Sequence, residues 1–170
     1  SASNIELAYG DFWHDGSLGI AESIVAGANH VVLYRRTVDA TGAVVYLPAF
    51  CDTSPPATCT AIAAGDVTGN GLPSVICGGS NGWVWYYANN GNWTRTYVDQ
   101  PAGQQINSVT VGDFNGDGWN DIAVGGNTGY LKYYPNLGYG RFQNTGMNDN
   151  WFAGAEQTVT GNATTGSYLS

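Results

Sequence analysis

The chain has 170 residues, enough for one domain or for a few small repeating units that share a core. Hydrophobic residues make up 43% of it and charged residues only 11%, which excludes an intrinsically disordered chain because enough apolar surface can be buried. The formal net charge is −8 with only five Lys and Arg, which argues against binding to nucleic acid or to an anionic membrane surface. The acidic excess suits divalent cations.

Turn-forming residues are abundant along the whole sequence. The 25 Gly residues, with many Asn and Thr, predict many turns and therefore many short strands. Long stretches of Ala, Glu, Lys and Leu, which would favour helices, are absent from the sequence, and no apolar run reaches the length of a membrane span. These features predict an all-β protein.

The first predicted unit is built around a loop of Gly and Asp. Residues 10–16 read Gly-Asp-Phe-Trp-His-Asp-Gly, and Leu7-Ala8-Tyr9 is the strand expected to enter this loop. Apolar runs follow at 24–27 and 30–34, about three residues later than in the units described below. We therefore expect the first loop to differ in geometry from the others.

The cysteines come next in the chain. Cys51 and Cys59 flank a Pro-rich loop, which predicts a local disulfide, with two free thiols as the alternative. Cys77 lies in the apolar run 74–77 and is predicted to be a buried strand thiol. The spacing of the three fits no zinc motif.

The Gly-Asp loop recurs twice. Residues 65–71 read Gly-Asp-Val-Thr-Gly-Asn-Gly, and residues 112–118 read Gly-Asp-Phe-Asn-Gly-Asp-Gly. Each loop leads into a short apolar run that ends in two glycines, and then into an aromatic strand at 82–87 or 129–134. The three loops begin 55 and 47 residues apart, as expected for the four-stranded blades of a β-propeller.

The sequence therefore predicts one repeat domain over residues 1–170, made of propeller-type blades of four-stranded antiparallel sheets. The units span about 4–55, 56–104 and 105–160, and residues 161–170 resemble the entering strand of a further unit. Three blades do not close a propeller, which typically has four to eight. Either the chain is part of a larger propeller, or copies form a homo-oligomer through their edge strands, closed or filamentous.

The third loop carries the pattern of a metal site. Oxygen-bearing side chains stand at its first, third, fifth and ninth positions (Asp113, Asn115, Asp117 and Asp121), and the Trp119 carbonyl fills a backbone position. Calcium prefers such hard oxygen ligands, and three carboxylates in one short loop would repel each other without a cation. The alternative is a solvated turn of Asn, Asp and Gly. We expect Ca²⁺ here.

The other two loops are poorer in ligands. The second offers a single carboxylate and is expected to be a weaker metal site (Asp66, Thr68, Asn70 and Ser74). In the first, Asp11 and Asp15 remain, but Trp13 and Gly19 stand at ligand positions. The three-residue offset could bring in Glu22 as a ligand, but we expect a structural turn.

The loop, the strand with its glycine pair and the repeat length resemble the FG-GAP/VCBS repeat of integrin-α propellers and of many secreted proteins. The resemblance runs from about residue 108 to 142, and the unit at about 60–92 is recognisable. It implies that the third loop binds calcium between neighbouring strands of a blade through the five groups named above. Fungal lectins of related propeller architecture imply glycan binding as a family-level expectation.

Catalytic motifs are absent from the sequence. His14 and His30 are the only histidines, no Ser lies in a Gly-x-Ser-x-Gly elbow, and no phosphate-binding Gly-rich motif occurs. We therefore expect a protein that is not an enzyme.

The favoured function is a secreted calcium-binding module that recognises a glycan or an extracellular protein, with calcium in a structural role. The alternative is a self-assembling subunit of an extracellular or cell-surface filament. Sequons at Asn92 and Asn162 permit glycosylation. Three tryptophans in or near turns are predicted to form an exposed contact surface (Trp93, Trp119 and Trp151).

Overall fold

The computed structural model describes residues 5–24, 29–100, 104–127 and 131–143. These ranges contain eleven strands and no α-helix, and therefore no helix that could cross a membrane. The strands are β1 (Ile5–Gly10), β2 (Gly19–Ile24), β3 (His30–Val38), β4 (Val44–Asp52), β5 (Cys59–Gly65), β6 (Ser74–Gly79), β7 (Val84–Ala88), β8 (Thr94–Asp99), β9 (Ile106–Gly112), β10 (Asp121–Gly126) and β11 (Leu131–Tyr134).

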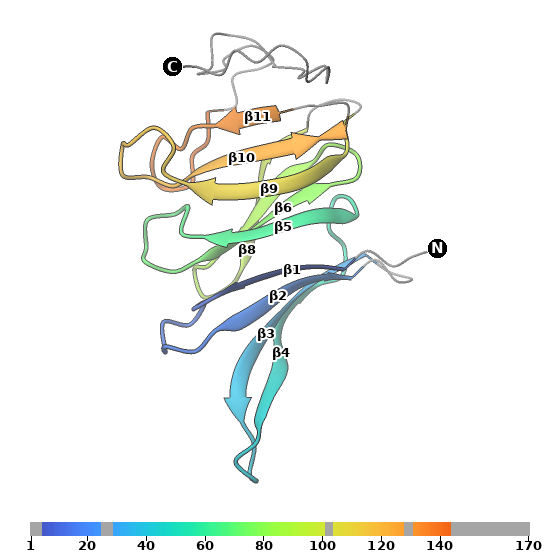
Figure 1. Ribbon diagram of the computed structural model, residues 1–170, viewed down its shortest axis with the longest axis vertical. Coiled ribbons are helices and arrows are strands. Elements are labelled where there is room, and N and C mark those ends of the chain that lie inside the picture. The colour runs from blue at the N-terminus through green and yellow to red at the C-terminus, as the bar shows by residue number, and fades with distance from the viewer. Residues whose placement is uncertain (1–4, 25–28, 101–103, 128–130, 144–170) are drawn as a thin grey trace, which may run out of the picture.

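The strands form three antiparallel sheets in which each strand pairs with its neighbour in the chain (Figure 1). The first sheet has the order β1-β2-β3-β4, the second β5-β6-β7-β8, and the third β11-β10-β9. This up-and-down order is that of propeller-like blades, so the predicted fold class is confirmed. The three sheets fall within the predicted units at about 4–55, 56–104 and 105–160.

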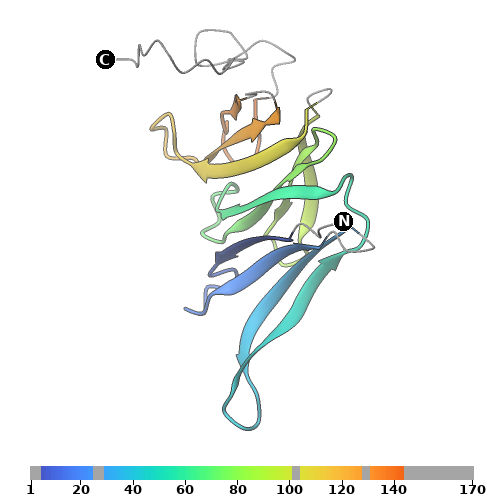
Figure 2. The same cartoon turned by 45° about the vertical axis from the view of Figure 1, so that its right-hand side comes forward.

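The first strands of the three sheets lie side by side, with β5 between β1 and β9 (Figures 1 and 2). Small residues allow this approach. A side chain at Gly65 would collide with Val111 of β9, and one at Gly78 would overlap Ile106. Gly79 in turn faces Ala57 and the Trp85 ring. The glycine pair of the second unit is therefore needed for close packing, because a side chain at either position would collide with a neighbour.

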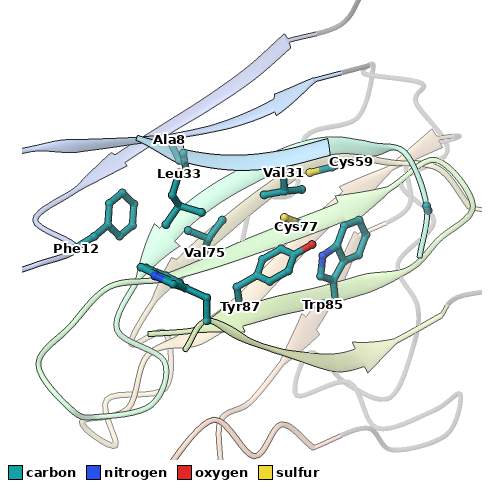
Figure 3. Close-up of a cluster of buried hydrophobic side chains, with 12 residues drawn as sticks. Ala8, Phe12, Val31, Leu33, Cys59, Val75, Cys77, Trp85 and Tyr87 are labelled. Atoms are coloured by element: carbon teal, nitrogen blue, oxygen red, sulfur yellow. The ribbon is translucent and has the colours of Figure 1, made fainter. Parts of the chain in front are cut away.

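Each neighbouring pair of sheets encloses its own hydrophobic core. Leu33 of the first sheet lies in one buried cluster with Val75, Trp85 and Tyr87 of the second, all fully buried (Figure 3). On the other face of the second sheet, Ile76 and Tyr86 pack in a second cluster with side chains of the third sheet (Ile106, Ile122, Val124 and Tyr134). The second sheet is thus covered on both faces, which explains why its strands read as continuous apolar runs.

The loop after the first strand is the same length in all three sheets, contrary to our expectation for the first. Gly10 pairs with Gly19, Gly65 with Ser74, and Gly112 with Asp121. No insertion separates the first loop from β2, because β2 begins at Gly19 and ends at Ile24, where the predicted apolar run only starts. The predicted offset, and with it the role considered for Glu22, is wrong: Glu22 pairs with Leu7 within the sheet.

The predicted bond between Cys51 and Cys59 is not formed, and both thiols are free. Strand alternation explains this. Asp52 is directed toward the second sheet, so Cys51 beside it points to the opposite, exposed face. Cys59 is buried in the first core together with Cys77, and Cys77 is the buried strand thiol that the sequence predicts (Figure 3).

Candidate functional site

The three Gly-Asp loops share one turn. The first Asp of each loop accepts a hydrogen bond from the backbone N–H of a Gly five residues later, and each such Gly has a positive φ. The pairs are Asp11–Gly16 at 3.0 Å, Asp66–Gly71 at 2.7 Å and Asp113–Gly118 at 2.9 Å. The geometry of the first loop is thus the same as that of the other two.

The third loop gathers oxygen atoms on an exposed turn. Asp113 Oδ1 accepts from the N–H groups of Gly116 at 2.7 Å and Asp117 at 3.1 Å. The Asn115 amide donates to Asp117 Oδ2 at 2.9 Å, and Asp117 Oδ1 accepts from the Trp119 N–H at 2.8 Å. These hydrogen bonds bring Asp113, Asn115 and Asp117 together on one turn.

Asp121, the last predicted ligand of this loop, is fully buried. Its Oδ2 accepts from the Tyr133 hydroxyl at 2.8 Å and the Phe114 N–H at 3.1 Å, and its Oδ1 from the Asn136 N–H at 2.8 Å. Burial, and then the hydrogen bond to Asp121, raises the pKa of Tyr133, so this hydroxyl remains a donor. Asp121 thus connects the loop to β11 and to the turn that follows it.

The donor set suits a hard cation but is not closed around one. Among the described residues, no group of three or more His, Cys, Asp or Glu side chains is close enough to hold a metal ion. A carboxylate offers about four acceptor positions. Asp113 and Asp121 each use three on the hydrogen bonds above, which leaves each one for a ligand role. The calcium assignment therefore stays a prediction.

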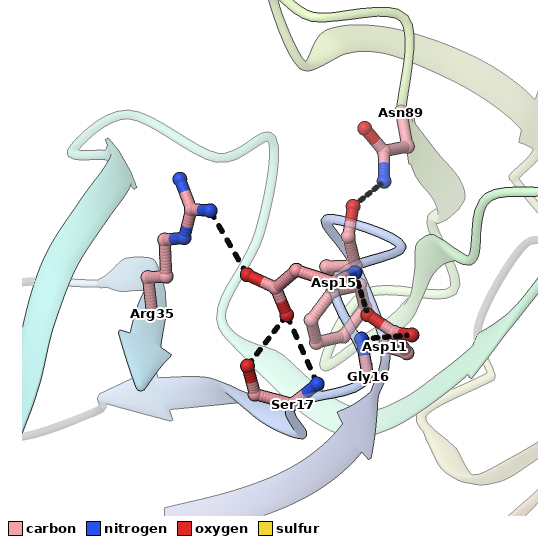
Figure 4. Close-up of polar contacts among 7 residues, drawn as sticks. Asp11, Asp15, Gly16, Ser17, Arg35 and Asn89 are labelled. Carbon is pink, nitrogen blue, oxygen red and sulfur yellow. Dashed lines mark hydrogen bonds and ion pairs between the residues drawn. The ribbon is translucent and has the colours of Figure 1, made fainter. Parts of the chain in front are cut away.

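The other two loops engage their predicted ligands differently. In the second, the Asn70 amide donates to the Asn89 carbonyl at 2.7 Å, and Ser74 is buried. In the first, Asp15 forms an ion pair with Arg35 at 2.9 Å (Figure 4). Hydrogen bonds from Ser17, and then from Arg35, lower the pKa of Asp15 to about 2. A cation of the chain itself thus pairs with one of the two carboxylates of the first loop.

Two asparagines that sequence reasoning missed connect each sheet to the loop of the preceding one. Asn89 donates through Nδ2 to the Phe12 carbonyl at 2.6 Å (Figure 4). Asn136 donates in the same way to the Val67 carbonyl at 2.8 Å and to the Asn120 carbonyl at 2.8 Å. Both are buried, so the loops are part of the contact between sheets. The sequence contains a pattern that could have identified them, because an Asn stands two residues after the second Tyr of the Tyr-Tyr pair in both units.

A second repeated contact joins the outer strands of neighbouring sheets. Asp52 at the end of β4 accepts from the Tyr87 hydroxyl at 2.8 Å and pairs with Arg95 at 2.7 Å. Asp99 at the end of β8 accepts from the Tyr134 hydroxyl at 2.9 Å and pairs with Lys132 at 2.6 Å. Burial opposes ionisation of both carboxylates, but these donors lower the pKa of each overall.

Residues 66–124 match the family model of the FG-GAP-like repeat. The chain carries an FG-GAP-like repeat. The matched segment begins at the first acidic residue of the second loop and ends in β10, so it contains both the second and the third acidic loops. FG-GAP repeats are generally non-catalytic recognition or structural modules and are typical of extracellular domains. No curated protein matches the sequence significantly.

A shallow hollow of about 390 Å³ lies between the outer strands of the first two sheets. Its lining includes the Tyr97 ring, which is 51% exposed, and the ion pair of Asp52 with Arg95. The Arg95 guanidinium lies 5.6 Å from the centre of the Tyr97 ring. The centres of the Trp83 and Tyr97 rings are 4.9 Å apart. An aromatic face beside paired charges suits a ligand with both apolar and hydroxylated surfaces.

The tryptophans that the sequence predicts to be exposed differ in how far they are buried. Trp93 is buried, with a positive φ of 53°, and its ring packs against those of Phe12 and Phe50, so its prediction is wrong. Trp119 is half-buried against Gly69 and the Tyr139 ring. Trp151 lies outside the described residues, as does the sequon residue Asn162, whereas the sequon residue Asn92 is exposed.

Proposed function

We propose that this chain is a secreted, non-catalytic recognition module of the propeller type, in which Ca²⁺ bound by the third loop has a structural role. The observation that carries the proposal is the cluster of Asp113, Asn115 and Asp117, whose oxygen atoms share one exposed turn. With the Trp119 carbonyl and Asp121 they make a set of hard oxygen donors, the kind that Ca²⁺ prefers.

The comparison between loops supports a cation at the third one. The first loop has Arg35 as the partner of Asp15. The other two ion pairs among the described residues are those of Asp52 and Asp99, so neither includes a carboxylate of the third loop. Asp113 and Asp117 thus lack a Lys or Arg partner in the part of the chain that the structure describes, and a bound cation would relieve their repulsion.

Calcium is expected to stabilise the fold, and Asp117→Asn to remove most of this effect. A ligand present at 100 times its Kd stabilises by about 2.7 kcal/mol, so unfolding by urea should require correspondingly more denaturant in CaCl₂ than in EDTA. Asp39→Asn is the matched control, since Asp39 also accepts backbone N–H groups in an exposed turn but is the one carboxylate in residues 38–44. Equal stability of the wild-type protein in CaCl₂ and EDTA would contradict the calcium proposal.

For recognition we propose a glycan as the ligand and the hollow around Tyr97 as its site. The Tyr97 ring supplies an exposed aromatic face, and Arg95 and Asp52 supply charged donor and acceptor groups beside it. A sugar ring has one apolar face and a rim of hydroxyl groups, so it matches this combination. Protein recognition through the same surface is the alternative.

Tyr97→Ala is expected to lower glycan affinity about tenfold or more while leaving the unfolding transition almost unchanged, because one aromatic stacking contact is lost from an exposed position. The measurement is a glycan array with the calcium-loaded protein, followed by titration of the sugars that bind. Tyr46→Ala is the control, since Tyr46 is a similarly exposed tyrosine of β4 outside the hollow. Unchanged affinity in the Tyr97 variant would exclude the hollow as the site.

A further inference from the structure

Because the three sheets are repeats, a residue of one sheet has an equivalent residue in each of the others. Some of these equivalents are buried between two sheets, and others are exposed. The face of a sheet that packs on the following sheet is called the trailing face, and the face that packs on the preceding sheet is called the leading face. Equivalent positions follow from the strand register, which aligns the loop glycines Gly10, Gly65 and Gly112.

The residue after the loop Asp belongs to the trailing face. Phe12 of the first sheet is 1% exposed because it packs in the core shared with the second sheet. Val67 of the second sheet is 0% exposed for the same reason, in the core shared with the third. Phe114 of the third sheet is 51% exposed. Among the described residues, a large aromatic side chain is therefore half exposed at a position where its two equivalents are core residues.

The leading face shows the same contrast at the other end of the molecule. Three positions before the loop Gly, Ile62 and Val109 pack against the core of the preceding sheet. One position before it, Ala64 and Val111 do the same. Their equivalents in the first sheet are Leu7, which is 63% exposed, and Tyr9, which is 73% exposed.

Further positions extend both faces. Ile5 is exposed on the same side of β1 as Leu7 and Tyr9. Leu131 is exposed on the trailing face of the third sheet, whereas Val84 at the equivalent position of the second sheet is fully buried. The three described sheets thus present half of a sheet contact on each outer face, and the halves correspond to the two sides of a contact that these sheets already form twice.

We propose that the trailing face of one copy, around Phe114 and Leu131, packs against the leading face of a second copy, around Leu7 and Tyr9. A second copy is the favoured partner because its leading face carries the residues that the repeat pairs with a trailing face. This contact is between faces of sheets, not between edge strands, and it does not depend on the proposed recognition function. The described sheets of two copies would number six, within the four to eight of closed propellers.

A polar contact between the copies follows from the same equivalence. Asn89 and Asn136 donate to the carbonyls of Phe12 and Val67. The corresponding acceptor on the trailing face is the Phe114 carbonyl. Arg36 occupies the position of these asparagines in the first sheet, since Tyr34 is the equivalent of Tyr87 and Tyr134. The Arg36 guanidinium of the second copy would donate to this carbonyl.

The test is the mass of the protein in solution, measured by sedimentation over a range of concentrations. The wild-type chain is expected to form a dimer. Leu7→Glu and Phe114→Lys should each raise the dimer Kd about 30-fold or more, because each places an unpaired charge in an apolar contact. Both residues are more than half exposed in the single chain, so neither substitution should unfold it. Leu47→Glu is the matched control, a similarly exposed leucine of β4 that should leave the dimer intact.

Mixing the two variants distinguishes a contact between opposite faces from one between identical faces. In the mixture, the glutamate introduced into one chain would meet the lysine introduced into the other, while the second contact of the closed dimer keeps its native residues, so dimers should reappear. A wild-type chain that stays monomeric at all concentrations would overturn the proposal. So would a dimer that only one of the two substitutions disrupts, since that pattern belongs to a contact between identical faces.

Discussion

Asn136→Ala is expected to be among the most destabilising single substitutions in this chain, at about 3 kcal/mol, because it leaves buried carbonyl groups without donors. The Asn136 amide donates to the Val67 carbonyl of the second loop and to the Asn120 carbonyl of the third, both at 2.8 Å. Its Oδ1 also accepts from the Gly138 N–H at 3.0 Å. Water cannot replace these contacts easily, since Asn136 is fully buried.

Chemical denaturation measures this loss, with Asn81→Ala as the control. Asn81 is exposed, and its side-chain carbonyl oxygen accepts only a long hydrogen bond of 3.4 Å from the Trp83 N–H. The control should cost less than about 0.5 kcal/mol, as surface substitutions usually do. If the two variants were equally stable, the contact between Asn136 and the preceding loop would carry no energy, and the proposed role of the asparagines in joining the sheets would be wrong.

The asparagine contact also explains what the acidic loops do in the fold. The first and second loops each hold in place the carbonyl of the residue after their Asp, and the next sheet binds that carbonyl through Asn89 or Asn136. A change in loop shape is therefore transmitted to the contact between sheets. The third loop takes part in such a contact too, because the Asn120 side-chain amide donates to the Asp66 carbonyl of the second loop at 2.9 Å, and this is the physical reason to expect a structural effect from a cation at Asp113 and Asp117.

The repeat was predictable because local residue types determine it. Gly-Asp loops, glycine pairs and aromatic strands are short-range patterns, and they correctly predicted strands that enter each loop and the all-β blades. The first unit was misaligned because β2 begins with Gly19 and Ile20 and carries Glu22, so its apolar character emerges only toward Ile24. The pairing of Gly10 with Gly19 is a property of the sheet and cannot be read from hydrophobicity alone.

The predictions of a Cys51–Cys59 disulfide and of an exposed Trp93 are wrong for the same reason. Both rest on the neighbouring sequence, whereas the direction of each side chain depends on the face of the sheet on which it lies. Cys51 is close to Cys59 in sequence, but strand alternation directs it away from the core in which Cys59 is buried. Trp93 follows a turn, yet its positive φ directs the ring into the cluster with Phe12 and Phe50. Neither fact can be known before the sheets are packed together.

Acid is expected to destabilise the fold through Asp52 and Asp99, the carboxylates that join neighbouring sheets. Burial alone would raise the pKa of each, but Arg95 and Tyr87 around Asp52, and Lys132 and Tyr134 around Asp99, lower it overall, as do backbone N–H groups. A pKa that is lower in the folded than in the unfolded chain contributes stability above the unfolded value of about 3.9. That contribution is lost as the pH falls through the lower folded value.

Asp99→Asn separates this contribution from general acid unfolding. The side chains of Asp99 and Lys132 are only 14% and 11% exposed, so the substitution leaves a nearly buried ammonium group without its partner. We expect a loss of about 3 kcal/mol at pH 7, as for other ion pairs broken from one side. Because the variant lacks one of the titrating carboxylates, its stability should fall less between pH 5 and pH 3 than that of the wild-type protein. Urea unfolding at several pH values measures both effects, and parallel pH profiles for the two proteins would show that Asp99 does not titrate as proposed.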